Sequence, residues 1–182
     1  MRSLKFSSAI REGILQSMSK NKNVIVLGLG VTDPKGIFGT TVGLEKKFGA
    51  KRVFEIPASE NAITGVAIGA ALKGARPILI HQRVEFSLLS LEQIINQAAK
   101  LNYMSGGKLK VPLVIRLIIG KGWGQGPQHS QSLENIFASI PGLKVISPSN
   151  SYDAKGMIVK SIKQNSPVII FEHRWLHELK NN

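Results

Sequence analysis

The sequence predicts an α/β fold, in which a doubly wound and mainly parallel sheet of about six strands carries helices on both faces. Short runs rich in Val and Ile recur along the chain, and most are apolar at every position, as expected for strands buried on both faces. Amphipathic stretches separate these runs, and this alternation of strand and helix is typical of parallel sheets. The 182 residues match one ordinary domain, so we expect residues 1–182 to form a single domain.

The expected strands are short, and three of them begin at proline, a residue that a strand tolerates at its first position. No linker, repeat or low-complexity segment interrupts them, which is consistent with one continuous sheet. The six strands are residues 24–28, 52–56, 77–81, 112–117, 143–147 and 167–172.

Helices are expected between the strands. Residues 60–73 are dense in Ala, Ile and Val, and Gly65 and Gly69 lie four apart, which predicts a central helix in close contact with its neighbours. Residues 86–104 repeat apolar side chains at spacings of three and four, which predicts a helix with one buried stripe. The stripe consists of Leu88, Leu91, Ile95 and Ala98.

The sequence also predicts where the last helix starts and how the chain ends. Asn150 precedes Asp153 by three residues, which predicts an N-cap followed by an acidic first turn. The C-terminal segment HELKNN is polar, and we expect it to fray.

Composition narrows the class of protein. The net charge is +13, from 24 Lys and Arg against 11 Asp and Glu, which suits an anionic cofactor or an acidic partner subunit. The basic residues are scattered and no nucleic-acid motif accompanies them, so we expect no nucleic-acid binding. No apolar run reaches the roughly 18 to 20 residues of a membrane span, and the N-terminus has no apolar signal core. We therefore expect a soluble cytoplasmic protein, and the absence of cysteine excludes disulfides and thiolate sites.

Glu60 is the first candidate functional residue. It follows the expected strand 52–56 after a short turn and opens the next helix, at the edge of the sheet where such folds bind ligands. The structural alternative is that an acid in a first helical turn only complements the helix dipole.

His129 and Phe86 are further candidates. Glycines at 120, 122, 124 and 126 precede His129, and they would let the backbone pass close to something bulky. This loop lacks the spacing of phosphate-binding motifs. A histidine there could exchange protons near neutral pH or could be structural. Phe86 could be a core residue or an aromatic plate for a flat ligand.

A metal site is not expected. His173 and His177 lie four apart, a spacing that could place two ligands on one helix face. They lack a third ligand and an HExxH pattern.

Several blocks together resemble one family. FEIPASENAITGVAIGAALKGARPI, EFSLLSLEQIINQAAKLNYMSGGKLKVPLVIR, GPQHSQSLE and IPGLKVISPSNSYDAKGMI closely resemble the beta subunit of the decarboxylating component of 2-oxo acid dehydrogenases, of the pyruvate and branched-chain type. The resemblance covers roughly residues 3–173. It implies the pyrimidine-binding domain of thiamine-diphosphate enzymes, which transketolase shares.

The resemblance also implies roles for single residues. Glu60 matches the glutamate that hydrogen-bonds the aminopyrimidine of thiamine diphosphate, so that the imino form of the ring can take the proton from the thiazolium carbon. Phe86 matches the residue that stacks on the pyrimidine, and Gln82 matches another position of the pyrimidine pocket, which is usually apolar in the family. His129 matches the active-site histidine near the substrate and acyl intermediate, where it could transfer protons or steady developing charge.

The sequence departs from the family in four places. Residues 28–31 read GLGV where members usually carry a GEDV-like acidic pair, so an acidic cofactor-pocket contact is expected to be lost. Residues 161–166 read SIKQNS, which weakens the case for the family's structural potassium ion. We expect the family's usual C-terminal second domain to be absent. The GDG motif with a downstream Asn, which binds diphosphate and magnesium, does not occur in this chain.

These departures imply a partner. We expect an alpha-type subunit that carries the diphosphate and magnesium motif, a heterotetramer, and thiamine diphosphate bound at the interface. The expected activity is decarboxylation of a 2-oxo acid and transfer of the acyl or aldehyde unit to lipoamide or another acceptor. Two alternatives stay open: a subunit of a split transketolase-like enzyme that transfers a two-carbon unit, and a non-catalytic partner or regulatory module.

Overall fold

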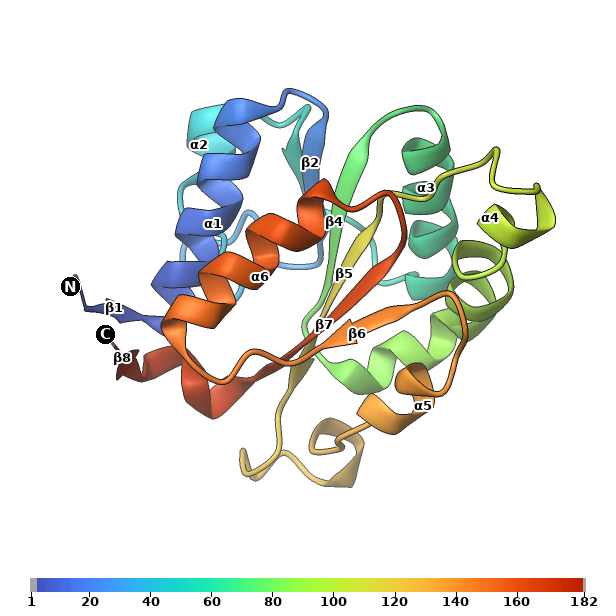
Figure 1. Cartoon of the computed structure of the whole chain (residues 1–182). Helices are drawn as coiled ribbons and strands as arrows, with labels where there is room; N and C mark the ends of the chain where they lie inside the picture. Colours follow the sequence, from blue (N-terminus) through green and yellow to red (C-terminus); the bar gives the residue numbers. More distant parts are fainter. Residues whose placement is uncertain (1–2, 182) are drawn as a thin grey trace.

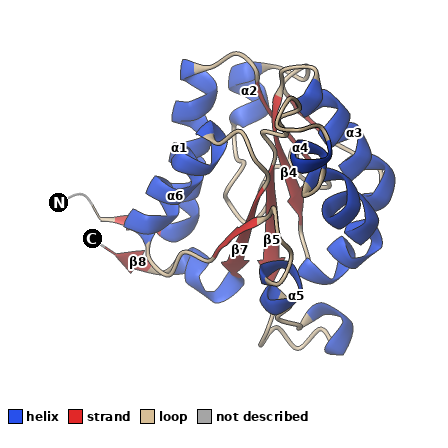
Figure 2. Cartoon of the chain, turned by 45° about the vertical axis from the view of Figure 1, so that its right-hand side comes forward, coloured by secondary structure: helices blue, strands red, loops and turns tan. Residues whose placement is uncertain are grey.

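The computed structural model describes residues 3–181 as three layers, with one parallel sheet between two layers of helices (Figures 1 and 2). The sheet has six strands in the order β3-β2-β4-β5-β7-β6, which confirms the predicted α/β class. Its strands are β2 (Val24–Gly28), β3 (Val53–Phe54), β4 (Arg76–His81), β5 (Val114–Ile119), β6 (Lys144–Ile146) and β7 (Val168–His173).

The helices follow the strands in turn. They are α1 (Phe6–Lys20), α2 (Leu44–Phe48), α3 (Glu60–Leu72), α4 (Leu101–Met104), α5 (Glu134–Ala138) and α6 (Ser151–Lys163). Shorter helical segments are η1 (Val84–Ser90), η2 (Gln93–Ala98), η3 (Pro127–His129) and η4 (Arg174–Glu178). None of the helices within residues 3–181 is long and apolar enough to cross a membrane.

Each face of the sheet has its own core, because side chains alternate along a strand. On one face, α1 and α6 lie side by side and pack on residues such as Val26, Ile78 and Ile170. On the other face, α3, η1 and η2 cover residues such as Leu79 and Ile115. Burial on both faces explains why the strands read as nearly continuous apolar runs.

The chain changes direction between β2 and β4. β2 is followed by β3 on one side, and the chain then crosses to β4 on the other side of β2. In open α/β sheets, ligands bind beyond the carboxyl ends of the strands at this kind of reversal. The loops that follow β2, β3, β4 and β5 all leave from that edge.

The region 86–104 is helical, but the predicted stripe is wrong. The segment is divided into the 3₁₀ segment η1, the π segment η2 and the short α4, so its side chains do not keep a period of 3.6. Leu88 is 37% exposed, whereas Ile94 is fully buried. Of the four predicted residues, only Ala98 belongs to the buried class.

Two other expectations need correction, and one is confirmed. The close contact predicted for helix α3 is not made at Gly69, where an added Cβ would meet nothing within 4 Å among residues 3–181, whereas one at Gly65 would lie 3.3 Å from Gln93. Residues 177–181 do not fray: His177 is fully buried, and β8 (Lys180–Asn181) pairs antiparallel with β1 (Leu4–Lys5). Asn182 lies outside the described residues. The N-cap is confirmed, because the side chain of Asn150 accepts a hydrogen bond from the Asp153 amide at 2.8 Å.

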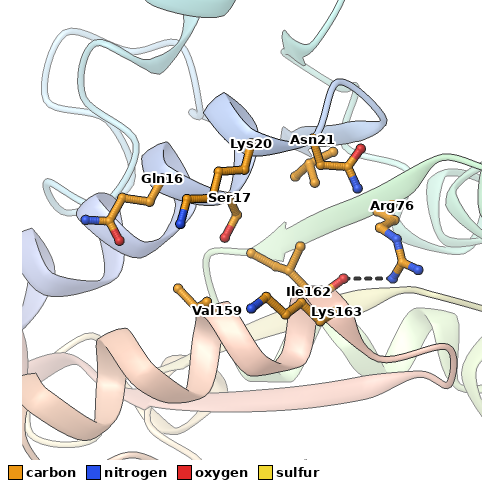
Figure 3. A pocket seen from close by; sticks show the side chains of 9 residues that line it. Gln16, Ser17, Lys20, Asn21, Arg76, Val159, Ile162 and Lys163 are labelled. Carbon is orange, nitrogen blue, oxygen red and sulfur yellow. Dashed lines mark hydrogen bonds between the residues drawn. The ribbon is translucent and has the colours of Figure 1, made fainter.

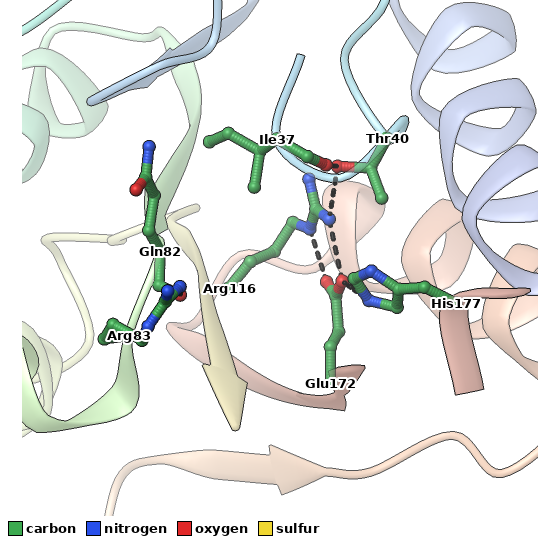
Figure 4. A network of polar contacts seen from close by, with 7 residues as sticks. All are labelled: Ile37, Thr40, Gln82, Arg83, Arg116, Glu172 and His177. Atoms are coloured by element: carbon green, nitrogen blue, oxygen red, sulfur yellow. Dashed lines mark hydrogen bonds and ion pairs between the residues drawn. The ribbon is translucent and has the colours of Figure 1, made fainter. Parts of the chain in front are cut away.

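A buried ionic network lies on the α1 and α6 face of the sheet (Figure 4). Arg116 of β5 donates to both carboxylate oxygens of Glu172 of β7, at 2.5 and 2.8 Å, and to the hydroxyl of Thr40 at 2.9 Å. His177 Nε2 lies 3.2 Å from the same carboxylate, and its ring stacks on Phe6. The network therefore joins two strands, the loop after β2 and the C-terminal segment.

The charges of this network depend on one another. Burial alone would raise the pKa of Glu172, but the charge and hydrogen bonds of Arg116, helped by His177, lower it to about 2. The carboxylate therefore stays ionised, and its contribution to stability is present above its ordinary pKa and is lost as the pH falls toward 2.

We predict that Arg116→Met lowers the free energy of unfolding by about 3–5 kcal/mol, because Glu172 would remain as a buried charge without its cation. The double variant Arg116→Met/Glu172→Met should lose clearly less, since no buried charge remains. Urea unfolding at pH 7 measures both values. A single variant within about 1 kcal/mol of the native chain would contradict this role for the pair.

A second prediction concerns His81, at the end of β4. Burial lowers its pKa to about 4, and its Nε2 is buried without a hydrogen-bond partner within residues 3–181. Between about pH 6.5 and 4, the unfolded chain binds a proton that folded His81 does not, so stability should fall as the pH drops through this window. We expect His81→Phe to remove up to about 3 kcal/mol of the change in the free energy of unfolding across this pH window, as measured by urea unfolding. An unchanged slope would show that His81 is not the group responsible.

Candidate functional site

Phe86 and His129 meet at the carboxyl edge of the sheet. Phe86 lies in η1 after β4, His129 ends η3 after β5, and these two strands are neighbours. The two ring centroids are 5.6 Å apart and the planes are perpendicular at 89°. Two of the predicted site residues, 43 positions apart in the sequence (129 − 86), are thus in contact.

Glu85 fixes the turn that carries His129. Its Oε1 accepts a hydrogen bond from the Gln131 amide at 2.6 Å, and the side chain is only 7% exposed. Its Oε2 is buried without a hydrogen-bond partner in the described part of the chain. Sequence reasoning missed Glu85, although an acid directly before Phe86 at this edge was a usable signal.

Gly120 explains part of the glycine-rich loop. A Cβ at this position would lie 2.5 Å from the carbonyl oxygen of His129 and 3.4 Å from the ring of Trp123. The loop therefore folds back on its own start, and only glycine allows that approach. Together with the bond from Gln131 to Glu85, this contact gives His129 a defined position on a flexible sequence.

Gln82 lies beside the loop 28–31. Its side-chain amide donates to the carbonyl of Leu29 at 2.6 Å, across the point where the chain reverses. The GLGV loop has no acid of its own, but Glu55, directly after β3, accepts hydrogen bonds from the Gly30 amide and from the Thr32 hydroxyl. A carboxylate is therefore present at this loop. This carboxylate belongs to Glu55, directly after the next strand, and sequence reasoning missed it.

Glu60 is the first residue of α3, as expected. It is partly buried, and within residues 3–181 its carboxylate makes no hydrogen bond or ion pair. Helix α3 packs against η1, the segment that carries Phe86. Glu60 thus stands at the same edge as Phe86 and His129, with its hydrogen-bonding capacity unused.

The paired histidines have separate partners. His173 Nε2 lies 3.6 Å from Glu134, whereas His177 contacts Glu172 in the buried network. Across residues 3–181, no three side chains of His, Cys, Asp or Glu gather as metal ligands.

A cavity of about 250 Å³ lies between the C-terminal ends of α1 and α6 (Figure 3). It is at the opposite edge of the sheet, where Arg76 at the start of β4 donates to the carbonyls of Ile162 and Gln164 at 2.9 and 2.8 Å. These bonds satisfy carbonyls that the end of α6 leaves free. The cavity is far along the strands from Phe86 and His129, and we assign it a structural origin.

The carboxyl edge offers what a flat, nitrogen-containing ring requires. Phe86 is 37% exposed and presents an aromatic surface, and Glu60 offers a carboxylate for a ring nitrogen. The side chain of Gln82 can donate or accept. These groups match those that the pyrimidine of thiamine diphosphate requires, while no Gly-Asp-Gly motif for its diphosphate occurs in the sequence.

Comparison with known proteins identifies relatives over almost the whole chain. It is 43% identical over 189 aligned positions to the acetoin:2,6-dichlorophenolindophenol oxidoreductase subunit beta of Cupriavidus necator, covering 98% of this chain and 56% of that protein. It is 41% identical to the pyruvate dehydrogenase E1 component subunit beta of Chaetosphaeridium globosum, covering 96% and 53%. The chain thus spans about half the length of these relatives.

A solved structure and a family profile agree on the fold. The structure of a split gene transketolase, an inactive beta4 tetramer, superposes with a TM-score of 0.74 over 91% of this chain and 50% of that one, at 19% identity, which shows a shared fold. The profile of the family described as "Transketolase, pyrimidine binding domain" matches residues 2–178. The chain therefore belongs to the transketolase pyrimidine-binding domain family of thiamine-diphosphate enzymes.

Proposed function

We propose that this chain is the beta-type subunit of a thiamine-diphosphate-dependent enzyme that acts on a 2-oxo acid, and that it supplies the pyrimidine half of the cofactor site. The observation that carries the proposal is the contact between Phe86 and His129 at the edge where Glu60 presents an unpaired carboxylate. The relatives named as pyruvate dehydrogenase and acetoin oxidoreductase beta subunits support the reaction class.

Each residue has a distinct role in this proposal. Glu60 hydrogen-bonds a nitrogen of the pyrimidine and holds a proton there. Phe86 packs against the flat ring, and Gln82 lines the pocket beside it. When bound, the cofactor would supply a nucleophilic carbon for reaction at the carbonyl of the 2-oxo acid. His129 then moves a proton or stabilises charge on the substrate during acyl transfer, from the position that Glu85 and Gly120 give it.

The other half of the site would come from an alpha-type partner. The sequence has no Gly-Asp-Gly motif, so in this proposal the partner holds the diphosphate and magnesium. Helix α3, which begins at Glu60, has exposed apolar residues such as Val66 and Leu72, a surface suited to a partner subunit. We propose a heterotetramer with the cofactor between unlike subunits.

The matched pair Glu60→Gln and Glu45→Gln tests the cofactor role. Both glutamates lie in the first turn of a helix, so both substitutions remove the same interaction with a helix dipole. With the partner, thiamine diphosphate and magnesium present, Glu60→Gln should lower 2-oxo acid consumption by at least about 100-fold. It should also slow deuterium exchange at the thiazolium C2 position. Glu45→Gln should change neither rate appreciably.

His129→Asn separates the two steps in the same assay. It should leave C2 exchange near the native rate and should lower turnover, because His129 is proposed to act on the substrate and not on the cofactor. Turnover by Glu60→Gln at the native rate would overturn the mechanism. Two-carbon transfer between sugars, with no consumption of 2-oxo acids, would favour the transketolase-like alternative.

A further inference from the structure

Positive charge gathers at the amino edge of the sheet, where the strands begin, opposite to the candidate site. Six connections lead from a helix into a strand, and all six reach this edge because the strands are parallel. Counted from the last helical residue to the first strand residue, the first four connections contain two basic residues each, the last two contain one each, and none contains Asp or Glu. The carboxyl edge is mixed, with acids such as Asp33 and Glu55 and bases such as Lys35 and Lys121. The fold therefore collects at one edge a charge that is scattered in the sequence.

Printed contacts join the α1 and α6 side of this edge into one continuous surface. Arg52, directly before β3, donates to the carbonyls of Met18 and Asn21 at the end of α1, at 2.9 Å each. The ends of α1 and α6 are neighbours, since both line the cavity shown in Figure 3. Lys144, at the start of β6, donates to the side chain of Gln164, directly after α6, at 2.6 Å. The surface therefore runs from the segment before β3, across the ends of two helices, to β6.

Six exposed lysines on this surface have no acidic partner. Lys5 and Lys155 are the only lysines that form ion pairs within residues 3–181, and neither is among the six. Helix dipoles account for the three that lie in the last turns of α1 and α6, but the other three lie outside the helices. The amino-edge surface consists of Lys20, Lys22, Lys51, Lys144, Lys160 and Lys163.

An apolar groove lies within the amino-edge surface. A cavity of about 510 Å³ is walled by Val145 and Ile146 of β6 and by Met157 of α6, with Lys144 and Lys160 beside them. Within residues 3–181, β6 pairs with β7 alone, so one side of its backbone has no neighbouring strand. An apolar groove beside an open strand edge is suited to take an extended segment of another polypeptide.

The composition of the surface favours an acidic polypeptide over a nucleic acid or a membrane. Nucleic acids are commonly bound with aromatic side chains that stack on bases and with arginines that contact phosphates, whereas the free charges here are all on lysines. No aromatic or large aliphatic side chain is exposed in residues 20–24, 46–53, 144–146 or 157–168. A protein that inserts into a lipid surface needs apolar side chains that protrude, and here the apolar residues lie in a groove.

We propose that the amino-edge surface binds an acidic segment of a partner protein other than the alpha-type subunit. Carboxylates of that segment pair with the six lysines, and one of its apolar side chains enters the groove beside β6. The inference goes beyond the proposed function and does not rest on it, because this surface and the candidate cofactor site lie at opposite edges of the sheet.

A labelled peptide of Glu-Glu-Leu repeats tests this proposal. When it is titrated with the whole chain at physiological ionic strength, its fluorescence anisotropy should rise to saturation. Lys20→Gln/Lys22→Gln/Lys163→Gln should weaken the binding at least about 10-fold, because three ion pairs with the peptide are lost. Lys35→Gln/Lys108→Gln/Lys180→Gln removes the same charge from exposed positions outside the surface, and should change the Kd much less.

Several results would overturn the proposal. These are no saturable binding of the peptide, equal weakening in the two triple variants, and tighter binding of a single-stranded oligonucleotide of equal charge. Binding to phosphatidylcholine vesicles that contain phosphatidylglycerol, without binding of the peptide, would assign the surface to an anionic membrane instead. A peptide with Gly in place of Leu should bind more weakly, and equal binding of the two peptides would reject the groove as the seat of an apolar side chain.

The reconstituted enzyme separates this surface from the proposed function. The lysine variants should leave 2-oxo acid consumption and thiazolium C2 exchange unchanged, and the complex with the alpha-type subunit should bind the peptide as the free chain does. Loss of peptide binding in the complex would show that the surface is covered within the enzyme, and would overturn the proposal. Intact peptide binding without any 2-oxo acid turnover would reject the proposed function alone.

Discussion

The buried pair of Arg116 and Glu172 is the interaction on which the carboxyl edge of the sheet depends. It lies on a sheet face whose other buried strand residues are apolar, and it reaches Thr40 in the loop after β2 and His177 near the C-terminus. Phe38, two residues before Thr40, and Arg174, two residues after Glu172, both line an open cavity at this edge. An ion pair inside the sheet thus holds the walls of a surface site. Its contribution is positional as much as energetic, because an apolar pair could fill the same space without fixing those loops.

A smaller set of contacts fixes the loops after β2 and β5 at the carboxyl edge. Glu85 holds the turn of His129, Glu55 holds the loop after β2, and Gly120 allows the glycine-rich loop to close on itself. Glu60 stands apart from these contacts, with a carboxylate that nothing in residues 3–181 satisfies. A carboxylate that has no protein partner, at the edge where such folds bind ligands, is suited to contact a ligand. The edge therefore combines a rigid frame with a few groups left free for binding.

Much of this could be read from the sequence, and the exceptions have physical reasons. The sequence predicts the six strands of the parallel sheet, because Val- and Ile-rich runs between turn residues leave few alternatives, but it does not predict the short pair β1 and β8. The prediction of a buried stripe at residues 88–98 is wrong because 3₁₀ and π geometry changes which side chains face the core. The sequence does not distinguish Arg116 and Glu172 from other strand residues, since their pairing depends on the order and register of β5 and β7. Local patterns do not encode that register.

The same distinction applies to the site. Phe86 and His129 could be proposed from resemblance, but their contact depends on β4 and β5 being neighbours. The scattered positive charge of the sequence indicates an anionic cofactor or partner, but it does not show where such a molecule would bind.

The central claim, that this chain holds only the pyrimidine half of a shared cofactor site, can be tested by calorimetry. Thiamine diphosphate with magnesium would be titrated into the chain, into a partner that carries the Gly-Asp-Gly motif and co-elutes with the chain in gel filtration, and into their complex. Our account predicts binding by the complex, with far weaker or undetectable binding by either chain alone. Equally tight binding by this chain alone, or no binding by the co-eluting complex, would contradict it.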